Sequence, residues 1–337
     1  MSISNFAIEY DAINSRNTFT HGDVITGRII LEVSKETKVQ ALIFIAQGKA
    51  RVCCVSGGVL DVPFLSSGTE VIGKGRHVFP FTFRIPNRKI PSSFTSCVGK
   101  IVHKLKAELK QSMKPTKKTK VHFTFRSKAD MDIPGLMEPQ YFCKDKSVKA
   151  FGSGNVSMDV HTKSMGYKQG EAVLVTLEVG NHSSRPVKPK FVLYQKKTYF
   201  AQGHKKVSTH DILKEKLEDI TASSGNTTVT KEITIPRQLP PSILNCSIIK
   251  LEYKLKIYLD IKYATDPEIK IPIVVLPRVS VPKQQAATAN LGFEAFRAPN
   301  QSPWSAGLEA ASEDDPPPPY GAYALYPPVS DESKAAI

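Results

Sequence analysis

The sequence predicts an all-β protein with two antiparallel β-sandwich domains in tandem and a disordered C-terminal tail. Three observations lead to this prediction: period-2 alternation of apolar and polar side chains, an internal repeat with an offset of 150 residues, and a change in composition after residue 280. We expect the N-terminal sandwich over 1–148, the C-terminal sandwich over 149–280 and the tail over 281–337.

The alternation that predicts strands is clearest in two segments, 100–109 and 251–261. In the first, Ile101, Leu105 and Leu109 share one face, while Lys104 and Lys106 take the other. Successive side chains of a β-strand point to opposite faces, so one face of such a strand is buried and the other meets solvent. Only 209–220 has a helical spacing of apolar residues, and we expect one short helix there.

The repeat rests on matching segments in the two halves of the chain. Ile85-Pro86, Pro91-Ser92 and Lys104-Leu105-Lys106 recur 150 residues later as Ile235-Pro236, Pro241-Ser242 and Lys254-Leu255-Lys256. A tandem duplication of this kind predicts that both halves have the same architecture. Many short strands separated by Gly and Pro, with no alternation of strands and helices, favour antiparallel sandwiches over a parallel sheet.

The tail differs from the rest of the chain in charge and in proline content. Residues 281–337 hold three basic and seven acidic residues and nine of the 24 prolines, so the tail carries −4 and residues 1–280 carry +19 of the net +15. The tail has no sustained apolar period, so it cannot bury enough surface to offset the entropy lost on ordering. We therefore expect it to be disordered.

Three blocks are similar to segments of one protein family: Gly22-Asp23-Val24-Ile25-Thr26-Gly27, the block from Gly73 through His77-x-Phe79-Pro80-Phe81 to Phe94, and the block from Leu239-Pro240-Pro241-Ser242 to Leu259. Through them the sequence resembles the arrestin domain-containing proteins, the α-arrestins, over almost its whole length. The resemblance implies two arrestin-type β-sandwiches, a short linker near 144–153 and a tail that recruits partners.

The tail contains a P-P-x-Y motif, formed by Pro317, Pro318 and Tyr320. Consecutive prolines hold the backbone in a polyproline II helix before binding, so little entropy is lost when it docks in the aromatic groove of a WW domain. The resemblance implies that the partners are WW-domain HECT-type ubiquitin ligases; the alternative is a solvated proline-rich linker. A second candidate, Pro327-Pro328-Val329-Ser330, has serine where the motif needs tyrosine.

Lysines are dense over 100–120 and again over 188–206. We identify Lys114, Lys117, Lys118 and Lys120 as a candidate basic patch. On the solvent face of an edge strand, lysines prevent sheets from pairing with one another; the alternative is attraction to cargo or to an anionic membrane surface. We expect no nucleic-acid partner, because no nucleic-acid-binding motif accompanies the charge and base reading favours arginine.

Catalytic and metal-binding motifs are absent from the sequence. The five cysteines include no C-x-x-C pair and the eight histidines no H-E-x-x-H, and G-x-S-x-G does not occur. We therefore expect no enzyme, no metal and no cofactor. His103 should be a buried core histidine. Cys246 should be a small buried hydrophobe, although a redox role stays open because a similar cysteine lies near this point in the thioredoxin-interacting member of the family.

The resemblance implies an adaptor that links membrane-protein cargo, such as the cytoplasmic regions of receptors or transporters, to these ligases, promoting ubiquitination and endosomal trafficking or degradation. Because no signal peptide or apolar stretch of membrane-spanning length is present, we expect a cytoplasmic protein, peripherally associated with the plasma membrane, endosomes and lysosomes. Two alternatives remain: a redox or signalling binder like the thioredoxin-interacting member, and a structural cargo-sorting component.

Overall fold

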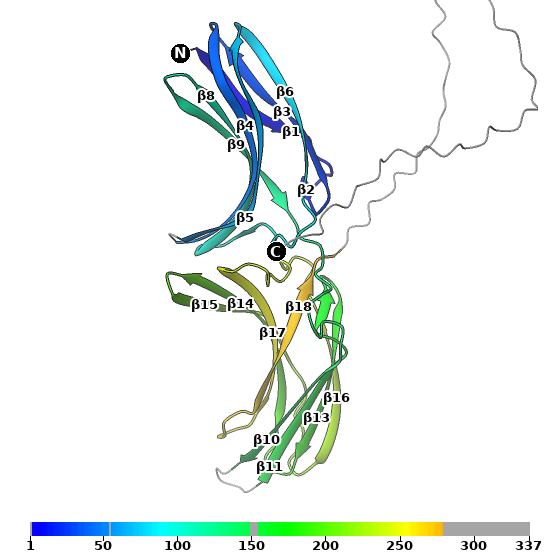
Figure 1. The fold of residues 1–337 in the computed structure, drawn as a ribbon. Coiled ribbons are helices and arrows are strands. Elements are labelled where there is room, and N and C mark those ends of the chain that lie inside the picture. Colours follow the sequence, from blue (N-terminus) through cyan, green and yellow to red (C-terminus); the bar gives the residue numbers. More distant parts are fainter. Residues whose placement is uncertain (1, 54, 149–153, 279–337) are drawn as a thin grey trace, which may run out of the picture. The chain divides into compact units, whose positions relative to one another are not determined.

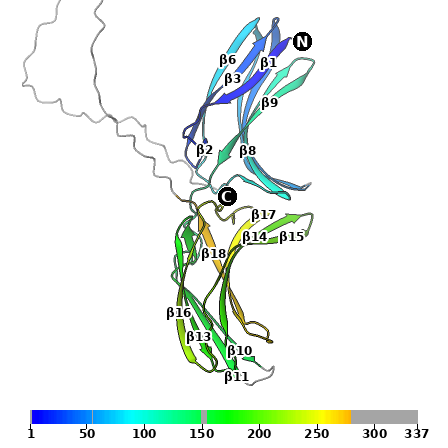
Figure 2. The same ribbon diagram turned by 180° about the vertical axis from the view of Figure 1, so that it is seen from behind.

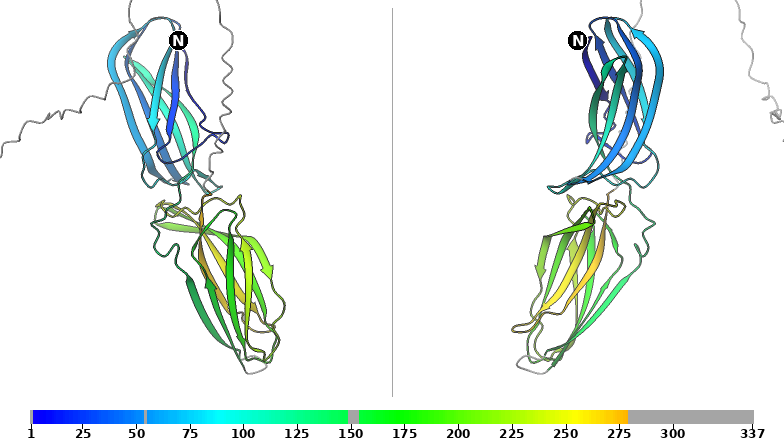
Figure 3. Two further views of the ribbon diagram at one scale, coloured as in Figure 1. Left: turned by 90° about the vertical axis from the view of Figure 1, so that its right-hand side faces the viewer. Right: turned by 60° about the vertical axis from the view of Figure 1, so that its left-hand side comes forward.

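The computed structural model describes residues 2–53, 55–148 and 154–278. This part of the chain is all-β, as predicted, with 18 strands and no helix (Figure 1). The strands form two β-sandwiches, each made of two facing layers that can be followed from behind in Figure 2 and from two further sides in Figure 3. No helix that could cross a bilayer is found among the described residues.

The first sandwich packs a three-stranded sheet on a larger one. The smaller sheet has the order β1 (Ile3–Tyr10), β3 (Val24–Val33) and β6 (Gly75–Arg84). The larger has the order β2 (Thr18–Phe19), β9 (Lys114–Phe125), β8 (Gly99–Gln111), β4 (Thr37–Val52) and β5 (Val55–Ile72), and β7 (Phe94–Thr95) also pairs with β8. Apolar side chains from both sheets fill the space between them, among them Ile25, Ile29, Phe44, Leu105 and Phe125.

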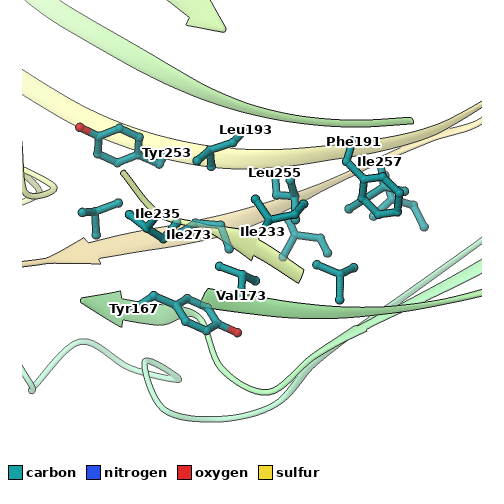
Figure 4. Close-up of a cluster of buried hydrophobic side chains, with 14 of the residues drawn as sticks. Tyr167, Val173, Phe191, Leu193, Ile233, Ile235, Tyr253, Leu255, Ile257 and Ile273 are labelled. Atoms are coloured by element: carbon teal, nitrogen blue, oxygen red, sulfur yellow. The ribbon is translucent and has the colours of Figure 1, made fainter. Parts of the chain in front are cut away.

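The second sandwich has a four-stranded and a five-stranded sheet. The first has the order β10 (Gln140–Val148), β11 (Gly154–Thr162), β13 (Ala172–Asn181) and β16 (Gly225–Thr234). The second has the order β12 (Gly166–Lys168), β18 (Glu268–Leu276), β17 (Ile249–Asp260), β14 (Lys188–Ala201) and β15 (His204–Lys216). Figure 4 shows part of the core between them, with Val173 and Ile233 facing Phe191 and Leu255.

The two halves repeat one topology, which confirms the duplication predicted from the sequence. The order β1-β3-β6 corresponds to β11-β13-β16, and β2-β9-β8-β4-β5 corresponds to β12-β18-β17-β14-β15. In both halves the short first strand of the larger sheet pairs in parallel with its neighbour. The repeated serines also act alike: Ser92 Oγ accepts the Ser127 N–H at 2.9 Å, and Ser242 Oγ accepts the Val275 N–H at 3.0 Å.

The helix predicted over 209–220 is wrong. Most of this segment lies in β15, which pairs with β14 in an antiparallel ladder from Ala201↔His204 to Lys190↔Lys216. The side chains of β15 are largely exposed, so their spacing carries no information about a buried face. Backbone pairing with a neighbouring strand decides the conformation here, and it outweighs a weak helical pattern.

The chain passes from the first sandwich to the second within 126–139. β10 is paired with β11 along its whole length, from Gln140↔Thr162 to Val148↔Gly154, and so belongs to the second sandwich. The predicted division at 148/149 and the expected linker at 144–153 therefore fall at the connection between β10 and β11. β10 is an edge strand with mostly exposed side chains, and such a strand resembles a linker in sequence because it lacks apolar alternation.

Equivalent positions in the two halves, His103 and Tyr253, hold buried polar side chains. His103 is 1% exposed, and its Nδ1 lies 3.0 Å from Ser93 Oγ. The Phe125 N–H donates to the same Ser93 Oγ, so the serine hydroxyl is free to donate to the imidazole. In the second half, Tyr253 Oη donates to the Pro240 carbonyl at 2.6 Å and accepts from Gln195 Nε2 at 2.9 Å. The expectation of a buried core histidine is confirmed.

Burial of His103 predicts acid sensitivity. Desolvation lowers the pKa of His103 from 6.5 to about 4 in the folded chain. The unfolded chain therefore binds a proton at this histidine more readily than the folded chain does. The folded state keeps its full stability above pH 6.5 and loses stability as the pH falls from 6.5 toward 4. Lowering the pH from about 7.5 to about 5 should cost the wild type roughly 2 kcal/mol more of unfolding free energy than it costs a His103→Gln variant. Urea unfolding at the two pH values measures this difference, and equal losses in both proteins would contradict the prediction.

Candidate interaction surfaces

The P-P-x-Y residues Pro317, Pro318 and Tyr320 lie outside the described residues, as does the degenerate motif over 327–330. Their proposed role in binding WW domains, and the predicted disorder of the tail, stay predictions. Among the described residues, no group of three or more His, Cys, Asp or Glu side chains is arranged to hold a metal ion.

Cys246 lies in the segment between β16 and β17 and packs into the core of the second sandwich. It is 4% exposed and belongs to the same hydrophobic cluster as Ile243 and Ile249. The side chain is a free thiol, as are those of the exposed Cys53, Cys97 and Cys143. A buried thiol is shielded from a partner's sulfur, so a mixed disulfide at Cys246 would require local opening of the core.

The four lysines of the predicted basic patch do not share one surface. Lys114 Nζ donates to Ser2 Oγ at 3.3 Å, and Lys117 Nζ donates to the Ile3 carbonyl at 3.0 Å. These two lysines therefore lie against the start of β1, at the edge of the smaller sheet. Lys118 and Lys120 are exposed on the other face of β9, opposite Glu108 and Lys106 of β8.

Strand pairing gathers a larger basic group on the solvent side of the first sandwich, which we call the basic face. Lys106 lies opposite Lys120 and Lys104 opposite His122 on β8 and β9, while Arg51 of β4 lies opposite Lys100 of β8. The alternating burial of β8 turns its lysines outward and its apolar residues inward. The basic face consists of Lys49, Arg51, Lys100, Lys104, Lys106, Lys118, Lys120 and His122.

The charges of the basic face are close enough to influence one another. Partial burial, followed by repulsion from Lys49, Lys120, Arg51 and Lys106, lowers the pKa of Lys104. Partial burial and then repulsion from Lys120, Lys104 and Lys100 lower the pKa of His122. A bound anion would relieve this repulsion, so the basic face is suited to a negatively charged partner.

One carboxylate, Glu108, accompanies the basic face among the described side chains. It forms an ion pair with Lys106 and lies 3.7 Å from Lys118, and the hydrogen bond from Lys106 lowers its pKa. No ion pair is found for Lys49, Arg51, Lys100, Lys104 or Lys120 within the described part of the chain. The basic face therefore keeps a net positive charge.

The lysines of the second sandwich are arranged differently, because acidic residues form ion pairs with several of them. Three ion pairs involve the lysine-rich segment 188–206: Lys188–Asp219 at 2.7 Å, Lys190–Asp260 at 2.5 Å and Lys196–Glu252 at 3.3 Å. The two lysine-rich segments of the sequence thus have different electrostatic environments, and the first is the stronger candidate for a binding surface.

Sequence reasoning missed the contribution of β4 to the basic face. Along β4, Lys49 and Arg51 lie on the outward face, and Ala50 and Val52 are buried on the opposite face. The β4–β8 ladder places the two basic residues beside Lys100 and Lys104. The alternation was visible in the sequence, but the pairing with a strand some 50 residues further along the chain was not.

Comparison with known proteins identifies both halves of the chain. The family model described as "Arrestin (or S-antigen), N-terminal domain" matches residues 63–132, and the model "Arrestin (or S-antigen), C-terminal domain" matches residues 152–280. Among curated proteins, the chain is 29% identical over 288 residues to "Arrestin domain-containing protein 4" of Mus musculus, covering 77% of this chain and 69% of that protein.

Two further relatives support the same assignment. "Arrestin domain-containing protein 4" of Homo sapiens is 29% identical over 286 residues, with 77% of this chain and 68% of that protein covered. "Thioredoxin-interacting protein" of Sus scrofa is 26% identical over 289 residues, with 80% and 74% covered. Both arrestin domain models match in chain order, the relatives span most of the described residues, and the two halves repeat one sandwich topology: the chain belongs to the arrestin family, as an α-arrestin.

Proposed function

We propose that this chain is an adaptor that brings WW-domain HECT-type ubiquitin ligases to membrane-protein cargo such as receptors or transporters, promoting ubiquitination and endosomal trafficking or degradation. Arrestin family proteins are non-enzymatic scaffolds or adaptors, and the relatives support an arrestin-like trafficking or adaptor role. The observation that carries the ligase part of the proposal is the P-P-x-Y motif at Pro317, Pro318 and Tyr320.

The motif has the chemistry that a WW domain recognises. Three residues form one turn of a polyproline II helix, so a motif bound in that conformation would present Pro317 and Tyr320 on the same side. The prolines enter an aromatic groove, and the tyrosine fills a second pocket that sets the register. The second candidate ends in Ser330 and so does not supply a second tyrosine for a tandem WW domain. Binding therefore rests on a single motif, without the gain in affinity that two linked contacts give.

The basic face supports a second part of the proposal, attachment to an anionic membrane surface where cargo is found. A lysine near an anionic leaflet gains about 1 kcal/mol, so several unpaired lysines on one sheet give useful affinity without an inserted anchor. The proposed location is therefore the cytoplasm, with peripheral association at the plasma membrane, endosomes and lysosomes.

A redox or signalling binder is the second candidate function, and it is favoured by the thioredoxin-interacting relatives. The burial of Cys246 weighs against it, because thiol exchange needs an accessible sulfur. A structural cargo-sorting component is a further alternative, and it would not require Tyr320.

Removal of the motif tyrosine tests ligase recruitment. Tyr320→Ala should lower the recovery of WW-domain HECT-type ligases in a pull-down at least about tenfold, because the tyrosine pocket is left empty and a large aromatic contact is lost. Tyr326→Ala is the matched control, since Tyr326 precedes its prolines and should leave recovery unchanged. Equal recovery with wild type and Tyr320→Ala would refute recruitment by this motif.

Removal of charge from the basic face tests membrane attachment. A Lys104→Gln/Lys120→Gln variant should bind vesicles that contain phosphatidylserine roughly 30-fold more weakly, from about 2 kcal/mol of lost attraction. The control is Lys188→Gln/Lys190→Gln, which removes the same charge from lysines already paired with Asp219 and Asp260. Cosedimentation measures both variants, and equal weakening would indicate that net charge rather than the basic face drives binding.

A further inference from the structure

A second positive site lies in a pocket that residues of both sandwiches line. Its volume is about 740 Å³, and none of its lining residues belongs to the basic face. Arg16 and Arg126 come from the first sandwich, and Arg237 and Arg278 from the second sandwich and the residues just after it. The pocket therefore brings together four guanidinium-bearing residues from four separate parts of the chain.

The backbone around each arginine is fixed by hydrogen bonds or close packing. The Arg126 N–H donates to the Phe19 carbonyl at 2.8 Å, directly after β9, and the Arg278 N–H donates to Gln169 Oε1 at 3.2 Å. The Arg16 N–H donates to Asn14 Oδ1 at 3.0 Å, in the connection between β1 and β2.

Arg237 is held by packing against a glycine. Its side chain lies over Gly170, so that a Cβ atom at that position would be only 2.8 Å from Arg237 Cγ. Gly170 has a φ of +86°, a conformation that favours glycine, and the absence of a side chain leaves room for the arginine stem.

The four arginines have no counter-charge in the described structure. No aspartate or glutamate lines the pocket, and none of the four guanidinium groups forms an ion pair or a side-chain hydrogen bond with a described residue. A guanidinium group is positively charged at every physiological pH. Arg16, Arg237 and Arg278 are exposed and Arg126 is half-buried, so solvent screens part of this charge, and a bound anion would compensate the rest.

The residue type indicates what kind of anion fits. A guanidinium group presents a planar fork of donors that matches the oxygens of phosphate and carboxylate in a bidentate manner. Four such groups offer far more donors than one carboxylate or one phosphate accepts, whereas a phosphate group supplies three strong acceptor oxygens. We propose that this pocket binds a compact small-molecule anion that carries two or more phosphate groups.

This site is independent of the proposed function, because it uses neither the tail motif nor the basic face. Its ligand would contact both sandwiches at once, through Arg126 on one and Arg237 on the other. Because such a ligand binds only when both are folded, it should also raise the thermal unfolding midpoint of the chain.

The experiment is a calorimetric titration of the full chain with inorganic tripolyphosphate at physiological salt. An Arg126→Gln/Arg237→Gln variant should bind roughly 100-fold more weakly, since hydrogen bonds to charged groups contribute about 1.5 kcal/mol or more each. Lys104→Gln/Lys120→Gln removes the same charge from the basic face and should change the affinity by less than about twofold. An Arg126→Lys/Arg237→Lys variant keeps the positive charge but lacks the planar, bidentate donors of the guanidinium group, and its affinity for tripolyphosphate should lie between those of wild type and the glutamine variant.

Each other outcome overturns the proposal. An absence of binding by wild type would exclude the site, and equal weakening by the pocket and basic-face variants would show that tripolyphosphate responds to net charge alone. Citrate that binds as tightly as tripolyphosphate would exclude the assignment to phosphate. Unfolding midpoints of the variants without ligand, within a few degrees of wild type, establish that a lost affinity is not a loss of folding.

Discussion

The burial of one face of the central strands between two sheets is the constraint on which the rest of this structure depends. In β8, Leu105 is fully buried while Lys104 and Lys106 on either side of it face solvent, and β17 repeats the arrangement around Leu255. A register slip of one residue would bring lysines into the core, so the alternation fixes the register. The same alternation assembles the basic face, which is the outward side of strands whose inward side forms the core.

The sequence predicts those parts of the fold in which one strand by itself shows alternating apolar and polar residues. The alternation in β8 and β17 and the repeat at 150 residues predicted two sandwiches, and the position of His103 on an apolar face predicted its burial. β10 and β15 were missed because they lie at sheet edges with exposed side chains. Their conformation comes from pairing with a neighbour, and their own residue pattern does not record it.

The candidate sites likewise depend on strand pairing that the sequence of one strand does not show. Their closeness in sequence suggested that Lys114, Lys117, Lys118 and Lys120 act together. In the structure the first two contact the start of β1, whereas the last two lie on the solvent side of the larger sheet. Arg51 reaches the basic face only through its pairing with β8. The arginine pocket is further from prediction, because its four residues come from different ends of strands and connections and share no local pattern.

The equivalent buried positions in the two halves, His103 and Tyr253, make the duplicated sandwiches chemically unequal. Burial raises the pKa of the tyrosine hydroxyl, which stays neutral in acid, whereas the histidine must take up a proton as the chain unfolds. His21 and His122, whose pKa values are also lowered, lie in the first sandwich as well. Acidification therefore has a cost at His103 in the first sandwich that the equivalent Tyr253 does not have in the second, so the two copies of one module differ in how this buried position responds to acid.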